Sequence, residues 1–294
     1  MTAHAVRAKD ITTLLLPATL LAVAVGALAF QLAPSLPDPF RPAAIVAPAT
    51  VTLPPGNLTY RPEGHFLQDN APIDGPRVTT TIAAPLVIMR HQVSVEDYAR
   101  CVADGACAAT AEAGLDGYPV TGVSFQDAIA YADWLSAQTG QVWTLPTDAE
   151  WAYAAAERYV DEAANVEDVG NPALRWLAEY REEAARSRTA DPLPHPQGHF
   201  GANSSGLMDL SGNVWEWTDT CHRRIHVDAA GAILSEQPAC TIRVIEGKHR
   251  ASTSYFIRDP KSGGCSVGLP PDNLGFRLVR RPAWHEQLLD RIGL

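Results

Sequence analysis

Proline and glycine account for 23 and 21 of the 294 residues, and this content predicts a chain with much irregular structure. Hydrophobic residues make up 46% of the sequence, which is enough for a globular protein with a full core. The formal net charge is -10, and no block of lysine and arginine is present. Binding to nucleic acid requires such a basic footprint, so we expect no nucleic-acid partner.

Residues 11–30 form an uncharged, mostly apolar segment. A helix of roughly 20 such residues is long enough to cross the hydrocarbon core of a bilayer. Arg7 and Lys9 precede the segment, so the positive-inside rule places the N-terminus in the cytoplasm and the rest of the chain outside it. We predict a membrane anchor over residues 1–30. The alternative is a signal peptide cleaved near Ala27-Leu28-Ala29, which would give a soluble periplasmic protein.

Composition divides the remaining chain into three parts. Residues 31–57 are rich in proline and alanine, and we predict a semi-rigid linker there. Residues 58–281 are expected to form the folded domain. Residues 282–294 are expected to form a C-terminal tail with a short amphipathic helix. In this interpretation the domain lies on the periplasmic side of the inner membrane and is held away from the bilayer by the linker.

Three helix starts are visible in the folded domain. Ser94, Ser124 and Thr147 each precede a helical pattern and have an acidic residue three positions later, as in a capping box. Residues 78–82 and 85–90 have the composition of short strands. We expect a helical excursion over residues 157–190, and mostly short strands and loops after Trp217. Helices early in the chain and strands late predict an α+β fold.

The five cysteines suggest export to an oxidising compartment. Cys101 and Cys107 would close a small loop, and Cys221 and Cys240 would close a larger one, so both pairs are candidate disulfides. Cys265 is left over in this arrangement, and a different pairing is the alternative.

Three stretches of the sequence carry a recognisable signature: Thr144–Trp151, Gly206–Trp217 and Asn273–Val279. Their order and spacing resemble the formylglycine-generating enzyme (sulfatase-modifying factor) superfamily over about residues 60–281. The resemblance implies a fold related to C-type lectins, with little regular secondary structure. Within the second stretch we expect Trp215 to lie in the core and Trp217 to line a groove.

The second stretch also has the composition of a calcium site. Calcium prefers six to eight oxygen ligands, including carboxylates and backbone carbonyls. The resemblance implies that the side chains of Asp209 and Glu216 bind a structural calcium ion together with the carbonyls of Gly212 and Val214. The alternative is that both carboxylates accept hydrogen bonds from nearby backbone groups.

The resemblance also identifies a difference from the active members of the superfamily. Their oxidase holds copper(I) with two nearby cysteines located before the last of the three stretches. Counting forward from Arg243-Val244, these positions are Ser252 and Ile257. Neither residue offers the thiolate that copper(I) prefers. We therefore expect neither copper binding nor formylglycine synthesis by the family's mechanism.

Other reactive side chains remain near the changed positions. His249, Ser252, Tyr255 and Cys265 are candidate catalytic residues, because a histidine and an accessible thiol could bind a metal or act as a nucleophile. An inert, packed thiol is the alternative for Cys265.

Two pairs of histidines have a spacing that can bind a metal on a helix. They are His195 with His199 and His222 with His226. No acidic third ligand is evident in the sequence for either pair. We therefore predict surface or loop roles for these four residues.

Two functional hypotheses follow. The first is an accessory or maturation factor with a periplasmic protein partner, similar to the superfamily branch that is encoded beside copper nitrite reductase. The second is an oxidoreductase of the superfamily that modifies a protein or small molecule with a different active site.

Overall fold

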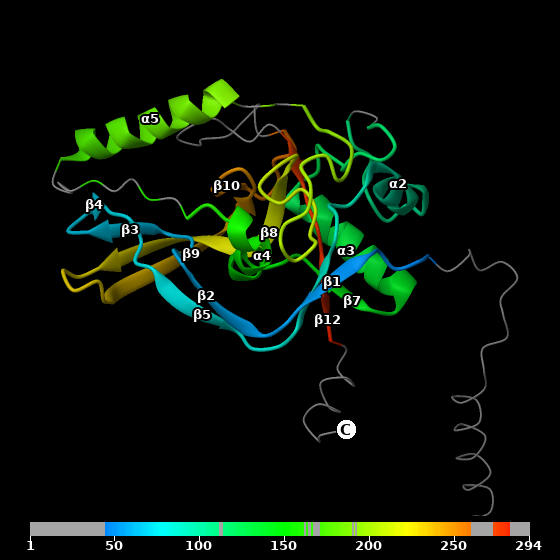
Figure 1. Cartoon of the computed structure of the whole chain (residues 1–294), viewed down its shortest axis with the longest axis horizontal. Helices are drawn as coiled ribbons and strands as arrows, with labels where there is room; N and C mark the ends of the chain where they lie inside the picture. Colours follow the sequence, from blue (N-terminus) through cyan, green and yellow to red (C-terminus); the bar gives the residue numbers. More distant parts are fainter. Residues whose placement is uncertain are drawn as a thin grey trace, which may run out of the picture. The chain divides into compact units, whose positions relative to one another are not determined.

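Three β-sheets and a few helices make up the folded part of the chain (Figure 1). The computed structural model describes residues 45–111, 114–161, 163, 166, 171–189, 191, 193–259 and 273–282. The strands in these ranges are β1 (Thr50–Leu53), β2 (Gly56–Tyr60), β3 (His65–Gln68), β4 (Ala71–Pro72), β5 (Val78–Ile82), β6 (Leu86–Met89), β7 (Val142–Thr144), β8 (Trp215–Val227), β9 (Ile233–Glu246), β10 (Ala251–Ser254), β11 (Leu274–Gly275) and β12 (Val279–Arg281). The helices are α2 (Val95–Ala103), α3 (Phe125–Thr139), α4 (Asp148–Ala155) and α5 (Pro172–Thr189), with a 3-10 turn at Ala156–Arg158.

The sheets bring together segments that are far apart in the sequence. One sheet has the order β1-β6-β12-β7, so β12 from the end of the domain lies between β6 and β7. A second sheet has the order β10-β9-β8-β3-β4, and β11 pairs with β8 in parallel. Strands β2 and β5 form a separate antiparallel pair. A mixed α and β fold with few helices is therefore confirmed.

Side-chain caps begin the three helices where the sequence predicts them. Ser124 and Thr147 each accept from the backbone N–H three residues later, and the acidic side chain at that position accepts in return, which completes both boxes. Ser94 caps α2 by accepting from the N–H of Asp97. The carboxylate of Asp97 pairs with Arg100 instead, so only half of this third box forms.

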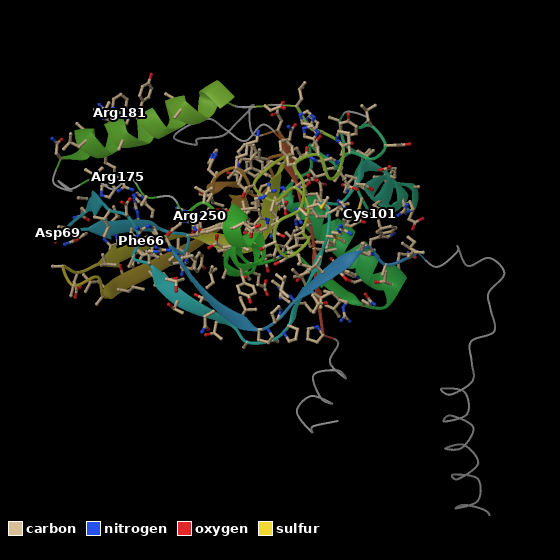
Figure 2. The ribbon with its side chains drawn as sticks, in the orientation of Figure 1. Phe66, Asp69, Cys101, Arg175, Arg181 and Arg250 are labelled. Atoms are coloured by element: carbon tan, nitrogen blue, oxygen red, sulfur yellow. A yellow bond between two sulfur atoms is a disulfide. The ribbon has the colours of Figure 1, made fainter. Side chains whose placement is uncertain are left out.

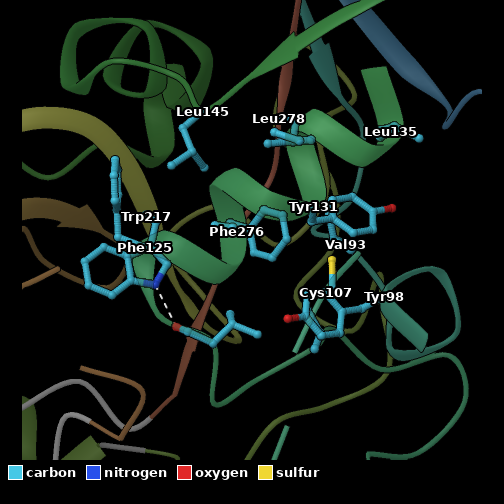
Figure 3. Close-up of a cluster of buried hydrophobic side chains, with 14 of the residues drawn as sticks. Val93, Tyr98, Cys107, Phe125, Tyr131, Leu135, Leu145, Trp217, Phe276 and Leu278 are labelled. Carbon is cyan, nitrogen blue, oxygen red and sulfur yellow. Dashed lines mark hydrogen bonds between the residues drawn. The ribbon is translucent and has the colours of Figure 1, made fainter. Parts of the chain in front are cut away.

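The main core lies between α2, α3 and the strands of the signature stretches (Figure 3). Tyr131 on α3 packs against Phe276 with 5.4 Å between ring centroids. Trp217 is fully buried, packs edge-on against Phe125, and donates from its Nε1 to the carbonyl of Val123 at 2.8 Å. The prediction that Trp217 lines a groove is therefore wrong, because its ring lies inside this core.

The two disulfides expected from the cysteine spacing are both present. Cys101 at the end of α2 is bonded to Cys107, and both sulfurs belong to the main core. Cys221 on β8 is bonded to Cys240 on β9. Cys265 lies outside the described residues.

A long hairpin replaces the short strands predicted after Trp217. Strands β8 and β9 have 13 and 14 residues and pair antiparallel along most of their length (Figure 1). The register shifts three times, including on both sides of Cys221. The outer part of β8 alternates only briefly, with Ile225 and Val227 buried against Phe66. The outer half of β9 is exposed at almost every position, so it lacks the alternation by which a half-buried strand is normally identified.

The fold begins earlier than the predicted domain boundary at residue 58. Strand β1 pairs with β6 from Thr50 to Leu53, so the C-terminal part of the predicted linker belongs to a sheet. Pro54 and Pro55 separate β1 from β2, which fits the inability of proline to continue a ladder. The predicted anchor and residues 283–294 of the predicted tail lie outside the described residues. Within the described residues, no helix is long and apolar enough to cross a bilayer.

Within the helical excursion predicted over residues 157–190, helix α5 covers Pro172–Thr189. It starts only at Pro172, whereas the prediction extended from residue 157. Arg175 pairs with Asp74 at 3.0 Å and so connects α5 to the loop after β4 (Figure 2). Trp176 and Tyr180 stack on each other and remain mostly exposed.

Candidate functional site

The three signature stretches meet at one buried ion pair. Glu216 in the second stretch binds Arg277 in the third, with distances of 2.6 Å from Nε to Oε2 and 2.7 Å from Nη2 to Oε1. Trp151 in the first stretch donates from its Nε1 to Glu216 Oε2 at 2.9 Å. Gln92 donates to Oε1 at 2.8 Å. The signature residues therefore act together to hold the fold around one carboxylate.

The hydrogen-bond donors around Glu216 matter for the calcium hypothesis, because they use the same carboxylate oxygens. Both side chains of the Glu216–Arg277 pair are at most 1% exposed. A bidentate guanidinium already neutralises Glu216, so little negative charge remains for a divalent cation. The rest of the Arg277 guanidinium donates to the carbonyls of Met89, Arg90 and Met208, which fixes its position.

The Asp209 carboxylate is also bound by donors. Its oxygens accept from the backbone N–H groups of Gly198 at 2.5 Å and Phe200 at 2.9 Å. Gly212 packs against Phe200, where a Cβ would lie 2.8 Å from the ring. Val214 is buried in the core. In this arrangement the alternative of hydrogen bonding to local donors describes Asp209, and calcium binding by Asp209, Gly212, Val214 and Glu216 stays a prediction.

Asp209 and Asn213 hold the loop that carries the first histidine pair. Both residues have a positive φ, of 59° and 65°. Asn213 accepts from the N–H of His195 at 2.8 Å and donates to its carbonyl at 2.9 Å. His195 and His199 then stack, with their ring centroids 4.1 Å apart. The signature stretch thus positions residues 195–200 through its side chains.

The alternative, hydrogen bonding to local donors alone, predicts a calcium-independent fold. Under this alternative, adding a chelator to purified protein should leave the melting temperature unchanged within error, because hydrogen-bond donors of the protein satisfy Asp209 and Glu216. Asp209→Ala should destabilise the protein by about 2–4 kcal/mol, since two partly buried amides would lose a charged acceptor. Thermal unfolding with and without chelator measures both effects. A drop in melting temperature that added calcium reverses would restore the calcium site.

The turn between β9 and β10 contains the first catalytic candidate. Gly247 lies against Trp215, and a Cβ there would be 2.9 Å from the indole ring. The His249 ring contacts the same indole edge-on at 5.2 Å between centroids, and Lys248 lies above it at 5.4 Å. Trp215 Nε1 donates to the carbonyl of His249 at 3.0 Å. Trp215 is buried as predicted, and it also supports the turn that carries His249.

The other candidates occupy different surroundings. Ser252 lies on β10 opposite Val244 of β9. Tyr255 and Ile257 follow the strand and pack against the main core. The backbone of Tyr255 also accepts from the N–H of Phe125. The position that the resemblance assigns to the second copper ligand is therefore filled by a hydrocarbon side chain packed on the core.

Sequence reasoning missed a buried charge network beside this turn. Arg250 donates from Nη1 to the carbonyl of Arg61 at 2.7 Å and lies 3.5 Å from Asp148 Oδ1 and 3.3 Å from the Tyr159 hydroxyl (Figure 2). Burial opposes its charge, but the carboxylates of Asp148 and Glu246 outweigh this effect and raise the pKa of Arg250. Burial and then Asp148 raise the pKa of Tyr60.

Two imidazole–carboxylate pairs supply acidic partners that the sequence did not reveal. His195 Nε2 lies 2.6 Å from Asp191 Oδ2. His222 Nδ1 bonds to Glu63, and this hydrogen bond raises the pKa of His222. Among the described residues, no three histidine, cysteine, aspartate or glutamate side chains are placed to hold a metal ion. Both pairs are therefore imidazole–carboxylate contacts that belong to no three-ligand group among the described residues.

The sequence matches the family described as Sulfatase-modifying factor enzyme 1-like domain over residues 37–282. This match covers most of the chain and includes all three signature stretches. The protein therefore belongs to the sulfatase-modifying factor family.

Individual relatives include active and inactive enzymes. The formylglycine-generating enzyme of Mycobacterium tuberculosis is 30% identical over 187 residues, which cover 56% of this chain and 58% of that protein. Inactive C-alpha-formylglycine-generating enzyme 2 of Mus musculus is 28% identical over 173 residues, which cover 54% of this chain and 48% of that protein. The chain thus spans about half the length of these relatives.

A solved structure shares the fold. The structure of PvdO from Pseudomonas aeruginosa aligns with a TM-score of 0.51 at 24% identity, and the alignment covers 80% of this chain and 95% of that chain. This likeness supports the family's fold for the present chain.

Proposed function

We propose that this protein is an exported, membrane-tethered accessory or maturation factor that acts on a protein partner in the periplasm, with copper nitrite reductase as the candidate partner. The described cysteines carry the proposal. Cys101, Cys107, Cys221 and Cys240 are all in disulfides, so none offers a thiolate to copper(I). A hydroxyl and a hydrocarbon occupy the two positions that the resemblance assigns to copper ligands.

The retained framework supports a binding role. The Glu216–Arg277 pair keeps the signature stretches in place, and Trp215 supports the turn of His249. This chain therefore keeps the scaffold of a family that acts on polypeptides while lacking its copper ligands. A scaffold of this kind can recognise a polypeptide without oxidising it.

Deletion of the gene tests the accessory role. In the deletion strain we expect copper nitrite reductase to accumulate at the normal protein level with reduced copper content and reduced activity. Re-expression of the full chain should restore both. Normal copper content and activity after deletion would reject this partner, and normal maturation of every exported metalloenzyme would reject the accessory role.

An oxidoreductase with a different active site is the second candidate. The two imidazole–carboxylate pairs and His249 favour it, because they could transfer protons. Metal analysis of the purified full chain distinguishes the two functions. The accessory role predicts no stoichiometric redox metal, whereas a bound redox metal that is lost in His249→Ala would favour the oxidoreductase.

A further inference from the structure

The two disulfides lie in contrasting surroundings. Cys101 and Cys107 are 0% and 8% exposed and belong to the same core cluster as Tyr98 and Val93. Figure 3 shows Cys107 with these two side chains. Cys221 is only partly buried, and Cys240 is exposed. Exposed disulfides exchange with external thiols more readily than buried ones, since an attacking thiolate must reach a sulfur atom.

Cys240 lies on an uncovered part of the sheet edge. Strand β10 pairs with β9 only from Ile242 to Ile245, and the N–H of Tyr255 adds one bond to the carbonyl of Thr241. Among the described residues, no strand pairs with the outer edge of β9 before this point. A partner can therefore approach Cys240 from the side without displacing a neighbouring strand.

The hairpin does not depend on the disulfide for its register. Strands β8 and β9 are paired before it, at Trp217 with Ile245, and after it, at His222 with Ala239. The ladder continues from His222 to Val227. Opening the disulfide would therefore leave pairing on both sides of Cys221 and need not unfold the hairpin.

Cys221 has basic residues next to it in the sequence and opposite it on the paired strand. It is in register with Arg243, and it is followed by His222 and Arg223. Asp219 and Glu236 partly balance the two guanidinium groups, and Glu63 holds the His222 ring. Cationic neighbours stabilise a thiolate, so Cys221 is the better leaving group of the two cysteines.

We propose that Cys221–Cys240 is a thiol–disulfide exchange site for a dithiol of a protein partner. A partner thiolate attacks Cys240 Sγ, forming a mixed disulfide, and the bond between the two cysteines breaks to release the Cys221 thiolate. The partner's second thiolate then attacks its own sulfur in the mixed disulfide and releases the Cys240 thiolate. The partner loses two electrons and becomes a disulfide, while Cys221 and Cys240 gain them and become a dithiol.

The inference goes beyond the accessory function and does not depend on it. Its test uses the purified full chain with dithiothreitol as the dithiol, so no natural partner is needed. Whatever the dithiothreitol experiment shows, the gene-deletion experiment separately decides the accessory role.

Stepwise reduction, followed by alkylation and peptide mass spectrometry, measures each disulfide separately. Cys221–Cys240 should be half reduced at a dithiothreitol concentration at least tenfold lower than Cys101–Cys107, with the circular dichroism spectrum unchanged. The buried disulfide is the internal control. Reduction of both disulfides at the same concentration, or reduction accompanied by loss of the folded spectrum, would overturn the proposal.

A matched variant checks that the hairpin disulfide is the oxidant. At low dithiothreitol, the wild-type chain should oxidise one equivalent, and Cys221→Ser/Cys240→Ser should oxidise less than a tenth of this amount. Reduced glutathione, a monothiol, should be trapped on Cys240 and not on Cys221. Equal oxidation by both proteins, or glutathione found on Cys221, would contradict the assignment.

Discussion

Glu216→Gln is expected to lower the free energy of unfolding by about 3–5 kcal/mol. The substitution keeps the size of the side chain but removes the charge that faces Arg277 at 2.6 Å and 2.7 Å. Arg277 would then be a fully buried cation without its counter-charge, and its contacts with backbone carbonyls would not replace a carboxylate. Chemical denaturation of the wild-type and variant chains measures the difference.

An exposed pair provides the control for this experiment. Glu236 pairs with Arg223 at 3.0 Å, but both side chains are partly exposed to water. Glu236→Gln should therefore change the stability by less than about 1 kcal/mol. A similar small effect of Glu216→Gln would show that the ion pair does not hold the signature stretches together.

Trp217→Ala should destabilise the protein by about 3–5 kcal/mol. The indole is fully buried, packs on Phe125, and satisfies the carbonyl of Val123. Its removal would leave a large cavity between α3 and β8 and a buried carbonyl without its donor. The melting temperature and the near-ultraviolet circular dichroism of the variant should both change.

Trp176 is the matched control for this substitution. It lies on α5 and is 61% exposed, so its truncation to alanine removes little buried apolar surface. Trp176→Ala should change the stability by less than about 0.5 kcal/mol. A large loss in Trp176→Ala together with a small loss in Trp217→Ala would contradict the placement of the two side chains.

Local patterns predicted the local structure well. The serine and threonine caps fixed the starts of α2, α3 and α4, because an N-cap bonds to a backbone group only two or three residues away. Both disulfides were predicted correctly from pairs of cysteines that lie 6 and 19 positions apart in the sequence. The signature stretches identified the family, since three fixed patterns in order rarely occur together.

These local patterns could not predict contacts between residues that are far apart in the sequence. Arg250 meets Asp148 across 102 positions, and Glu63 meets His222 across 159. The residues next to Arg250 and Glu63 in the sequence do not indicate these partners. The outer hairpin was missed for a different reason, because the outer half of β9 is exposed on both faces and lacks the period-two pattern of a half-buried strand.

The surroundings of Glu216, one of the residues in the calcium hypothesis, also depend on a long-range contact. Asp209 and Glu216 have the spacing and charge of a cation site when the second stretch is considered alone. Arg277 comes from the third stretch, 61 positions after Glu216, and its guanidinium binds the Glu216 carboxylate. The sequence of one loop could not reveal that a guanidinium pairs with one of its two carboxylates.

The central proposal is that this chain does not carry out the family's copper-dependent oxidation. A peptide containing Cys-x-Pro-x-Arg, incubated with the copper(I)-treated full chain and oxygen, tests it most directly, with the active Mycobacterium tuberculosis enzyme as the positive control. The account predicts no hydroxylamine-reactive aldehyde on the peptide with this chain. Aldehyde formation at a rate comparable to that of the control enzyme would contradict it.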